Sequence, residues 1–320
     1  CRIELGADGP GGGSGLRLGE LEGLPGAVLV RSIPGGSFEQ VTLRLGLLHA
    51  LEASGVPVCN PPRAIERCVD KAMTSFLLAR AGLPVPATWV TERAEMAQAL
   101  ARQAQDQGFA LVLKPLFGAQ GKGLRLVRTP EDLPDPAELA GVHYLQRFVG
   151  RHEAATATWS DYRVLVAGGA AVAAMARHGT HWITNVGQGG VPQHVPATGR
   201  RAELAAAAAR ILGCDHAGVD LIEDEQGELL VLEVNSMPAW QGLQSVSTVD
   251  IAAEIAHLGD GGIVAVTRSS EELAGDLEQA AVILDAVRSG WLPPTPNLHV
   301  CMRCGHFVSC PATGARRGSR

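Results

Sequence analysis

The chain has 320 residues, of which 46% are hydrophobic and 19% charged, an ordinary globular composition that excludes a fully disordered protein and predicts about two domains. A net charge of −6 without a basic stripe argues against a nucleic-acid partner, and no apolar run reaches the roughly 18 residues that a membrane span needs. An odd number of cysteines, seven, disfavours a secreted disulfide framework and indicates a reducing, cytoplasmic setting.

The first part of the chain is expected to form a small parallel α/β unit. The glycine-rich residues 6–15 suggest a loop, or the remainder of an incomplete N-terminal domain. Short apolar strands at 27–31 and 56–58 flank a helical pattern over 38–54. This β-α-β order is typical of a parallel sheet.

From residue 63 onward, helices and strands alternate over a longer stretch. Residues 63–81 carry the strongest helical pattern of the chain and predict one continuous helix. The later strands are expected to form a mixed sheet, and a final strand and helix are expected after residue 262. The other predicted helices are 92–106, 200–212 and 248–258, and the predicted strands are 109–115, 124–128, 143–149, 161–166, 170–176 and a hairpin within 214–238.

The hairpin within 214–238 carries the strongest chemical signal. Glu233 and Asn235 stand two residues apart, so on a strand they share one face, and a turn near residue 225 brings Asp220 opposite 231–233. Two carboxylates and an amide oxygen among apolar residues need a compensating charge, and Mg²⁺ accepts such oxygen ligands. The alternative is an acidic edge that stays in water. The apolar neighbours favour burial and therefore a metal site.

A lysine followed by a glycine loop forms the second signal. Lys114 ends an apolar strand, and GAQGKG (118–123) leads into another strand rather than a helix, so the segment is not a P-loop. A glycine loop between two strands can cover phosphates with its backbone N–H groups, although an ordinary hairpin turn is the alternative. Lys71, Arg163 and Arg177 can each contact an anion, but each taken alone is more typical of a surface position.

These segments occur together in a defined order. They are DKAMTSFLLARAGLPVP (70–86), VLKPLFGAQGKGL (112–124), YLQRFV (144–149), DYRV (161–164), NVGQGG (185–190), GVDLIED (218–224) and LEVNSMP (232–238). The set resembles the ATP-grasp superfamily, specifically the RimK-type glutamate ligases, over about residues 27–258. The stretches VRSIPGGS and NPPRAIERCVDKAMTSF are more similar to tetrahydromethanopterin:glutamate ligases than to the ribosomal-protein modifiers.

The resemblance implies an α+β fold in which two α+β subdomains grip ATP, preceded by a small parallel α/β domain. The implied divisions are an N-terminal domain over 1–62, an ATP-grasp domain over 63–258 and a Cys-rich C-terminal extension over 259–320. The family chemistry activates a carboxylate with ATP to an acyl phosphate, which an amine attacks to give an amide, ADP and phosphate. The implied partners are L-glutamate and a small carboxylate acceptor such as a pterin.

The resemblance also assigns roles to residues by position. Arg177 would approach the transferred phosphate, with Lys114 beside it, while Asp220, Glu233 and Asn235 would hold Mg²⁺ or Mn²⁺. The positions implied to contact the nucleotide are Lys71, Lys114, Gly118, Gln120, Gly121, Gly123, Gln146, Arg147, Phe148, Val149, Asp161 and Asn185.

Within that nucleotide set, each part takes a different portion of ATP. The lysines contact the phosphates, the glycine loop covers them, and Asn185 approaches the phosphate–metal cluster. Residues 146–149 lie along adenine through backbone groups, and Asp161 approaches the ribose. The family commonly has an acidic residue where this chain has Arg147, which leaves backbone contact to adenine as the expectation.

The C-terminal tail carries a separate pattern. Its spacing, C-x2-C-x-H-x3-C, places four soft ligands within ten residues and suggests a structural Zn²⁺ site, with a reduced, unligated cluster as the alternative. The four residues are Cys301, Cys304, His306 and Cys310. The remaining cysteines, Cys59, Cys68 and Cys214, stand among apolar residues and are expected in the core.

The sequence leaves three functions open. The first is an ATP- and Mg²⁺-dependent ligase that adds L-glutamate to a small acceptor. The second is a RimK-like protein or peptide glutamate ligase. The third is a nucleotide-binding module without turnover, which retention of all three metal ligands disfavours because a mere binder has little need of them. Homo-oligomerisation is left open.

Overall fold

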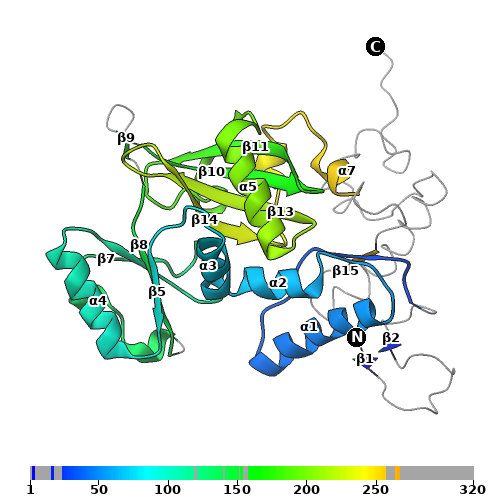
Figure 1. The fold of residues 1–320 in the computed structure, drawn as a ribbon, viewed down its shortest axis with the longest axis horizontal. Coiled ribbons are helices and arrows are strands. Elements are labelled where there is room, and N and C mark those ends of the chain that lie inside the picture. The colour runs from blue at the N-terminus through cyan, green and yellow to red at the C-terminus, as the bar shows by residue number, and fades with distance from the viewer. Residues whose placement is uncertain are drawn as a thin grey trace. The chain divides into compact units, whose positions relative to one another are not determined.

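The computed structural model divides the chain into two compact units, Cys1–Pro62 with Ala252–Arg320, and Arg63–Ile251 (Figure 1). The predicted glycine-loop residue Gln120 and the four predicted zinc ligands of the tail, Cys301, Cys304, His306 and Cys310, lie outside the described residues. The structure describes residues 2–3, 16–17, 24–118, 121–139, 141–150, 152–153, 158–256 and 264–266.

The first unit contains a small parallel sheet. Its strand order is β15 (Val264–Val266), β3 (Val28–Val30) and β4 (Val58–Cys59), and both pairings are parallel. The predicted parallel β-α-β unit is therefore confirmed, and a strand from beyond residue 262 completes the sheet. A separate antiparallel pair joins β1 (Arg2–Ile3) to β2 (Leu16–Arg17).

Helix α1 (Phe38–Ala53) connects β3 to β4. Ser37 begins it with a capping box, in which its hydroxyl accepts from the N–H of Gln40 and the Gln40 side chain accepts from the N–H of Ser37. The helix buries the leucines at 47, 48 and 51 as the spacing predicts, whereas Leu43 of the same stripe is exposed.

The predicted helix over 63–81 forms two helices, α2 (Pro62–Val69) and α3 (Lys71–Arg80), so the prediction of one helix is wrong. Asp70 separates them because its backbone is extended and its carboxylate accepts from the N–H groups of Ala72 and Met73. An aspartate N-cap therefore begins a new helix within one continuous apolar pattern. Lys71 becomes the first residue of α3.

The second unit contains two antiparallel sheets, which corrects the prediction of a mixed sheet. Helix α4 (Ala94–Asp106) packs its alanines at 97, 101 and 104 on the smaller sheet, together with Leu111, Leu113, Val127 and Leu145. The smaller sheet has the order β5 (Thr88–Thr91), β8 (His143–Arg147), β6 (Leu111–Lys114) and β7 (Arg125–Val127). Turns η1 (Pro130–Asp132) and η2 (Pro136–Leu139) lie between two strands of this sheet, β7 and β8, in the chain.

The larger sheet carries the hairpin that the sequence singled out. Its β9 (His152–Glu153) pairs with β10 outside the main order. Strands β5 and β12 are absent from the predicted elements, because neither segment has a strong apolar alternation. The main order is β12 (Val191–Val195), β11 (Ala170–Gly179), β10 (Thr158–Ala167), β13 (His216–Glu223) and β14 (Leu229–Asn235).

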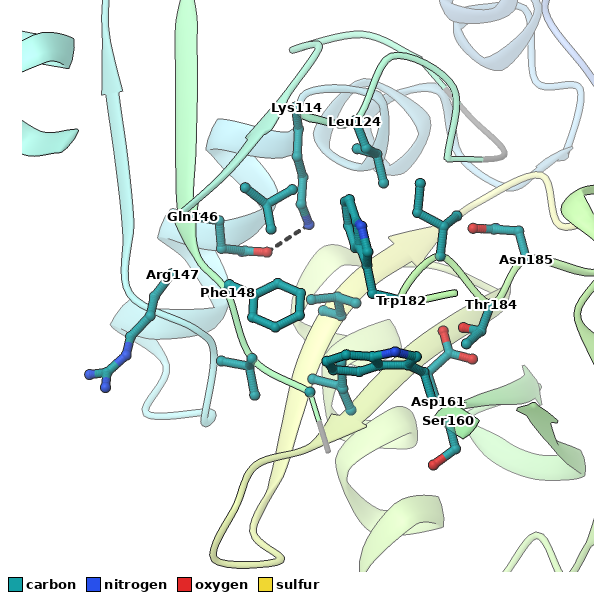
Figure 2. Close-up of a pocket in the computed structure, with 17 residues that line it drawn as sticks. Lys114, Leu124, Gln146, Arg147, Phe148, Ser160, Asp161, Trp182, Thr184 and Asn185 are labelled. Carbon is teal, nitrogen blue, oxygen red and sulfur yellow. Dashed lines mark hydrogen bonds between the residues drawn. The ribbon is translucent and has the colours of Figure 1, made fainter. Parts of the chain in front are cut away.

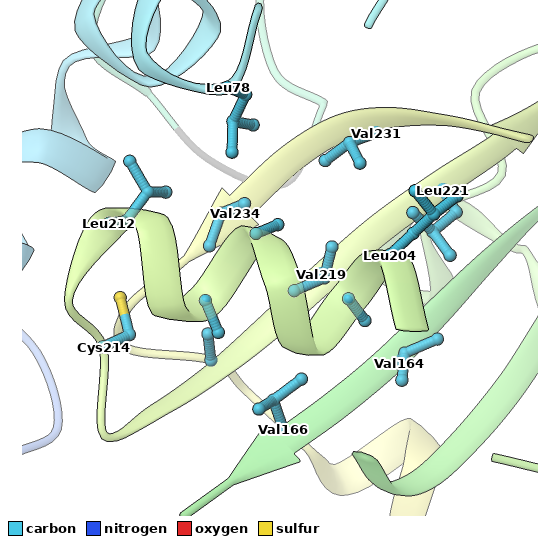
Figure 3. Packing of buried hydrophobic residues seen from close by; sticks show 14 of the residues in the cluster. Leu78, Val164, Val166, Leu204, Leu212, Cys214, Val219, Leu221, Val231 and Val234 are labelled. Atoms are coloured by element: carbon cyan, nitrogen blue, oxygen red, sulfur yellow. The ribbon is translucent and has the colours of Figure 1, made fainter. Parts of the chain in front are cut away.

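Helix α5 (Gly199–Leu212) covers one face of the larger sheet (Figure 3). Its buried face, which includes Leu204 and Leu212, packs on the apolar strand residues Val164, Val219 and Val234. Because strand side chains alternate, the polar residues between these valines lie on the opposite face. The remaining elements are η3 (Val186–Gln188), α6 (Gln241–Gln244) and α7 (Ile251–Ala256). No helix in the described ranges is long and apolar enough to cross a bilayer.

Candidate active site

A pocket lies between the two sheets of the second unit (Figure 2). Its empty volume, including the part open to solvent, is about 590 Å³. Lys114 and Leu124 line it from the smaller sheet and the segment beside it, and Asp161 and Leu232 from the larger sheet. Six of the predicted nucleotide-contact positions outside the glycine loop line this pocket in addition to Lys114: Gln146, Arg147, Phe148, Val149, Asp161 and Asn185.

Three aromatic side chains form an apolar wall of the pocket. Phe148 meets Trp159 edge to face with ring centroids 5.5 Å apart, and meets Trp182 in the same way at 5.8 Å. Figure 2 shows the Phe148 and Trp182 rings facing the pocket. Flat apolar walls of this kind suit a planar aromatic ligand group such as a nucleobase. The two tryptophans are not among the predicted site residues, because neither belongs to one of the motifs that predicted the site.

Lys114 is a buried cation at the pocket. Its Nζ donates to Oε1 of Gln146 at 2.6 Å, and Gln146 in turn donates to Oγ1 of Thr88 at 3.0 Å and to the hydroxyl of Tyr144 at 3.3 Å. Burial lowers the pKa of Lys114 to about 8, although the carboxylate of Glu233 opposes that shift. The Gln146 side chain therefore orients the lysine.

Backbone groups of the strand end at 146–149 are partly used within the fold. The N–H of Arg147 donates to the carbonyl of Ala87 at 2.8 Å, and that of Phe148 to the carbonyl of Ala110 at 2.9 Å. The Arg147 guanidinium lies 4.7 Å from the ring centroid of Phe109. The N–H groups of Arg147 and Phe148 and the Arg147 side chain are thus used in contacts within the protein. Contact of the other backbone groups of residues 146–149 with adenine stays a prediction.

Lys71 is the second lysine near the site. Its Nζ donates to the carbonyl oxygens of Leu116 at 3.3 Å and Gly118 at 2.8 Å, so the start of α3 holds the start of the glycine loop. Burial lowers the pKa of Lys71, while the nearby carboxylates of Glu233 and Asp70 raise it. The buried Lys114, the half-buried Lys71 and Glu233 therefore share one electrostatic environment.

The end of the glycine loop lies against the segment that contains Asn185. A Cβ atom at Gly121 would stand 2.8 Å from Oδ1 of Asn185 and from Nε2 of Gln188, and 2.9 Å from Cγ2 of Ile183. Gly121 also has φ of +67°, a left-handed conformation that favours glycine. Gly123, with φ of +74°, packs equally closely on Pro115. The left-handed backbone favours glycine at both positions, and a Cβ atom at either would force a neighbouring side chain to shift.

The three predicted metal ligands lie on one face of the hairpin β13–β14. Asp220 pairs directly with Glu233 and Gly218 with Asn235, so the predicted pairing of the two carboxylates is confirmed. Nδ2 of Asn235 donates to the Gly218 carbonyl at 3.4 Å, which leaves its Oδ1 as a free acceptor. Asp220 is buried, whereas Glu233 is half-buried and has no hydrogen-bond or ion-pair partner in the described part of the chain.

Two arginines on neighbouring strands neutralise the acidic residues of that face. Arg163 donates to both oxygens of Asp220, from Nε and Nη2, at 2.7 Å each. Arg177 donates to both oxygens of Asp161 and lies 3.3 Å from Oδ2 of Asp220. Burial by itself would raise the pKa of Asp220, but the guanidinium groups of Arg163 and Arg177 outweigh it and lower that pKa. Asp161 and Arg177 are placed together, while their predicted roles at ribose and phosphate stay predictions.

The donor set of the hairpin fits a hard divalent cation. Two carboxylates and an amide oxygen are the ligand types of Mg²⁺, and Glu233 and Oδ1 of Asn235 are uncommitted. No group of three Cys, His, Asp or Glu side chains positioned for a metal occurs in the described ranges, so Asn235 and non-protein ligands would be needed to complete the coordination.

Residues 68–258 match the RimK-like ATP-grasp domain. A tetrahydromethanopterin:alpha-L-glutamate ligase of Methanococcus maripaludis is 38% identical over 218 residues, which cover 66% of this chain and 72% of the relative. The enzyme of the same name from Methanocaldococcus jannaschii is 39% identical over 212 residues, 62% of this chain and 69% of the relative. Human N-acetylaspartylglutamate synthase A is 31% identical over 253 residues, 77% of this chain and 63% of the relative.

Solved structures agree on the fold. The ATP-grasp ligase PsnB complexed with its minimal precursor superposes with a TM-score of 0.56 at 22% identity, and the match covers 75% of this chain and 80% of PsnB. A RimK domain ATP-grasp protein from Sphaerobacter thermophilus gives a TM-score of 0.51 at 23% identity, covering 68% of this chain and 78% of the neighbour. The predicted α+β fold is confirmed, and the chain belongs to the RimK-like ATP-grasp family.

Proposed function

We propose that the chain is an ATP-dependent α-L-glutamate ligase that joins L-glutamate to a small carboxylate acceptor and releases ADP and phosphate. The observation that carries this proposal is the gathering of Lys71, Lys114, Asp220 and Glu233 close enough for their charges to influence the pKa of Lys114. A ligand rich in negative charge, held with a divalent cation, matches this mixture of lysine cations and free carboxylate.

The proposed reaction has two steps, with no nucleophilic side chain in either. In the first, an oxygen of the acceptor carboxylate attacks the γ-phosphorus of ATP, the bond to the β–γ bridging oxygen breaks, and ADP leaves. In the second, the glutamate amine attacks the acyl carbon, phosphate leaves, and the amine loses a proton. Both steps bring anionic groups together, so catalysis is mainly charge neutralisation and positioning.

The chain's own residues supply that neutralisation. Lys114, oriented by Gln146, and Lys71, at the start of α3, provide cations for the phosphates. Asp220, Glu233 and Asn235 would hold Mg²⁺, which when bound neutralises phosphate charge. Gly121, near the end of the glycine loop, lies against Asn185. The loop would cover the phosphates and exclude water from the acyl phosphate.

The relatives indicate the substrates. Three matched relatives at 33–39% identity are named tetrahydromethanopterin:alpha-L-glutamate ligases, and others are named probable alpha-L-glutamate ligases. Glutamate is therefore the proposed amine, and a pterin with a terminal carboxylate is the proposed acceptor. The measurement that separates this acceptor from peptides is a screen of both classes with ATP and radiolabelled glutamate.

The central test is the substitution Glu233→Gln. We expect it to abolish ADP release that depends on glutamate and acceptor, because it removes the free carboxylate of the metal set. Circular dichroism and the thermal unfolding midpoint should change little, because Glu233 makes no hydrogen bond or ion pair in the described part of the chain and interacts with Lys71 and Lys114 only through its charge. Glu228→Gln, on the exposed turn of the same hairpin, is the matched control and should turn over normally.

Asp220→Asn should also abolish turnover, although it removes the acidic partner of Arg163 and one of the two acidic partners of Arg177 and should lower stability. Turnover at the wild-type rate in Glu233→Gln would contradict the metal assignment. Binding of ATP without ADP release in the wild-type chain, with every acceptor tried, would favour a nucleotide-binding module.

A further inference from the structure

The bidentate contact between Arg163 and Asp220 has a consequence for cation binding. Nε and Nη2 of Arg163 each lie 2.7 Å from one oxygen of Asp220, and Nη2 of Arg177 lies 3.3 Å from Oδ2. A carboxylate has about four lone-pair positions, and three of them are thereby occupied. The buried carboxylate that points toward Glu233 is thus already neutralised by side chains of the protein.

The two arginines are not held alike. Arg177 has a side chain that is 2% exposed and forms a second, bidentate pair with Asp161. Arg163 has a side chain that is 15% exposed, and within the described residues Asp220 is its one acidic partner. Arg177 is therefore a fixed part of the sheet, whereas Arg163 can leave Asp220 by breaking a single ion pair.

A divalent cation on Asp220 would be placed beside the guanidinium that now occupies it. The two positive groups would share one carboxylate in a buried setting where charge repulsion is weakly screened. Binding of the metal ion and retention of the Arg163 fork on Asp220 therefore oppose each other.

We infer that Arg163 is a placeholder cation, which holds Asp220 neutral in the absence of a metal ion and competes with divalent cations for that carboxylate. This inference rests on the proposed function, because it takes the face that carries Asp220 and Glu233 as the metal site. Contact of Arg163 with Asp220 and binding of the metal ion to Asp220 each weaken the other.

The placeholder has a benefit and a cost for the protein. Without it, Asp220 would be a buried carboxylate opposite a second carboxylate, an arrangement that destabilises the fold. With it, a metal ion arriving alone must displace a guanidinium that then lacks an anion. A metal ion that arrives with a nucleotide brings phosphate groups that such a guanidinium can contact, so metal and nucleotide are expected to bind together far better than the metal alone.

The test measures binding of Mn²⁺ alone to the full chain by electron paramagnetic resonance, without substrates or turnover. Arg163→Met should bind Mn²⁺ about tenfold more tightly than the wild-type chain, within the range typical of coupled sites. Arg163→Lys, which keeps the charge but loses the fork, should give a smaller gain and serves if the methionine variant is unstable. Arg125→Met, which breaks an exposed pair with Glu138, is the matched control and should change nothing.

Further measurements show where the added Mn²⁺ affinity arises, and they distinguish failure of the placeholder role from failure of the proposed function. The double variant Arg163→Met with Glu233→Gln should lose the added affinity, which would place it at this site. Unchanged or weaker Mn²⁺ binding in both Arg163 variants, with wild-type Mn²⁺ binding intact in the presence of ADP, would overturn the placeholder role and leave Arg163 as a structural residue. Absence of Mn²⁺ binding by the wild-type chain even with ADP would instead contradict the proposed function.

Discussion

Lys114 is a cation in a place where burial disfavours charge. Its ammonium group is nearly inaccessible, and its hydrogen bond to Gln146 provides an acceptor without a formal charge. The result is a pKa of about 8, well below that of a lysine in water. The group is thus charged at neutral pH and loses that charge only slightly above it.

The sign of the resulting pH effect differs between folding and binding. Because the unfolded chain keeps the lysine proton up to about pH 10.4, it binds more protons than the folded chain between pH 8 and that value, and the free energy of unfolding gained from Lys114 rises with pH there. Phosphate binding needs the charged form. The affinity for nucleotide should therefore fall across the same window.

We predict that the dissociation constant for ADP rises about tenfold between pH 7 and pH 9, because a group with a pKa near 8 is mostly neutral at pH 9. Titration calorimetry at a series of pH values measures it. Lys114→Arg should flatten the profile, since arginine stays charged. An equally steep profile in that variant would assign the effect to another group.

Among single residues, the sequence predicts contacts within one hairpin better than contacts between strands that are far apart in the chain. The pairing of Asp220 with Glu233 follows from strand alternation and one turn, both visible in a short stretch. The ion pair of Arg163 with Asp220 depends on the register between β10 and β13, which are joined by a long segment containing a further strand pair and a helix. No local pattern encodes that register.

Among the elements, the segment from α2 to α3 shows how one polar residue overrides a pattern. Apolar spacing continues across Asp70, so periodicity predicts one helix, but the carboxylate satisfies the first N–H groups of a new helix. The break has a functional effect, because it places Lys71 in the first turn of α3, from where it reaches the carbonyls of Leu116 and Gly118.

Gly121 offers a test of the glycine loop as an element. We predict that Gly121→Ala raises the dissociation constant for ADP by at least about tenfold, because a Cβ there would displace the loop from Asn185, Gln188 and Ile183. Fluorescence of the pocket tryptophans gives the measurement.

The matched control for this variant is Gly108→Ala. Gly108 has a similar φ of +74°, but a Cβ there would meet nothing within 4 Å. Both variants should lose stability from the strained backbone, and only Gly121→Ala should lose affinity. Equal affinities in the two variants would show that the contact of the loop with the Asn185 segment is unimportant for binding.

For the whole molecule, the position of the pocket indicates that nucleotide binding does not need the C-terminal part of the chain. All pocket-lining residues fall between Val112 and Leu232, within the second unit. We predict that removing residues 267–320 leaves the affinity for ADP unchanged, as measured by calorimetry. A loss of binding would make the tail part of the nucleotide site. Removing residues 259–320 should in addition lower stability, because it deletes β15 from the parallel sheet.

Strand β15 also sets an order for assembly of the polypeptide. Strand β3 (Val28–Val30) lies between β4 and β15, and it gains β15 as its second neighbour only after residues 264–266 have been made. Every strand of the second unit, by contrast, ends by Asn235. During synthesis from the N-terminus, the ribosome therefore completes the strands of both antiparallel sheets of the second unit before β15 can join the parallel sheet. The parallel sheet, two of whose strands precede the second unit in the chain, therefore gains its final hydrogen bonds only after every strand of that unit has been made.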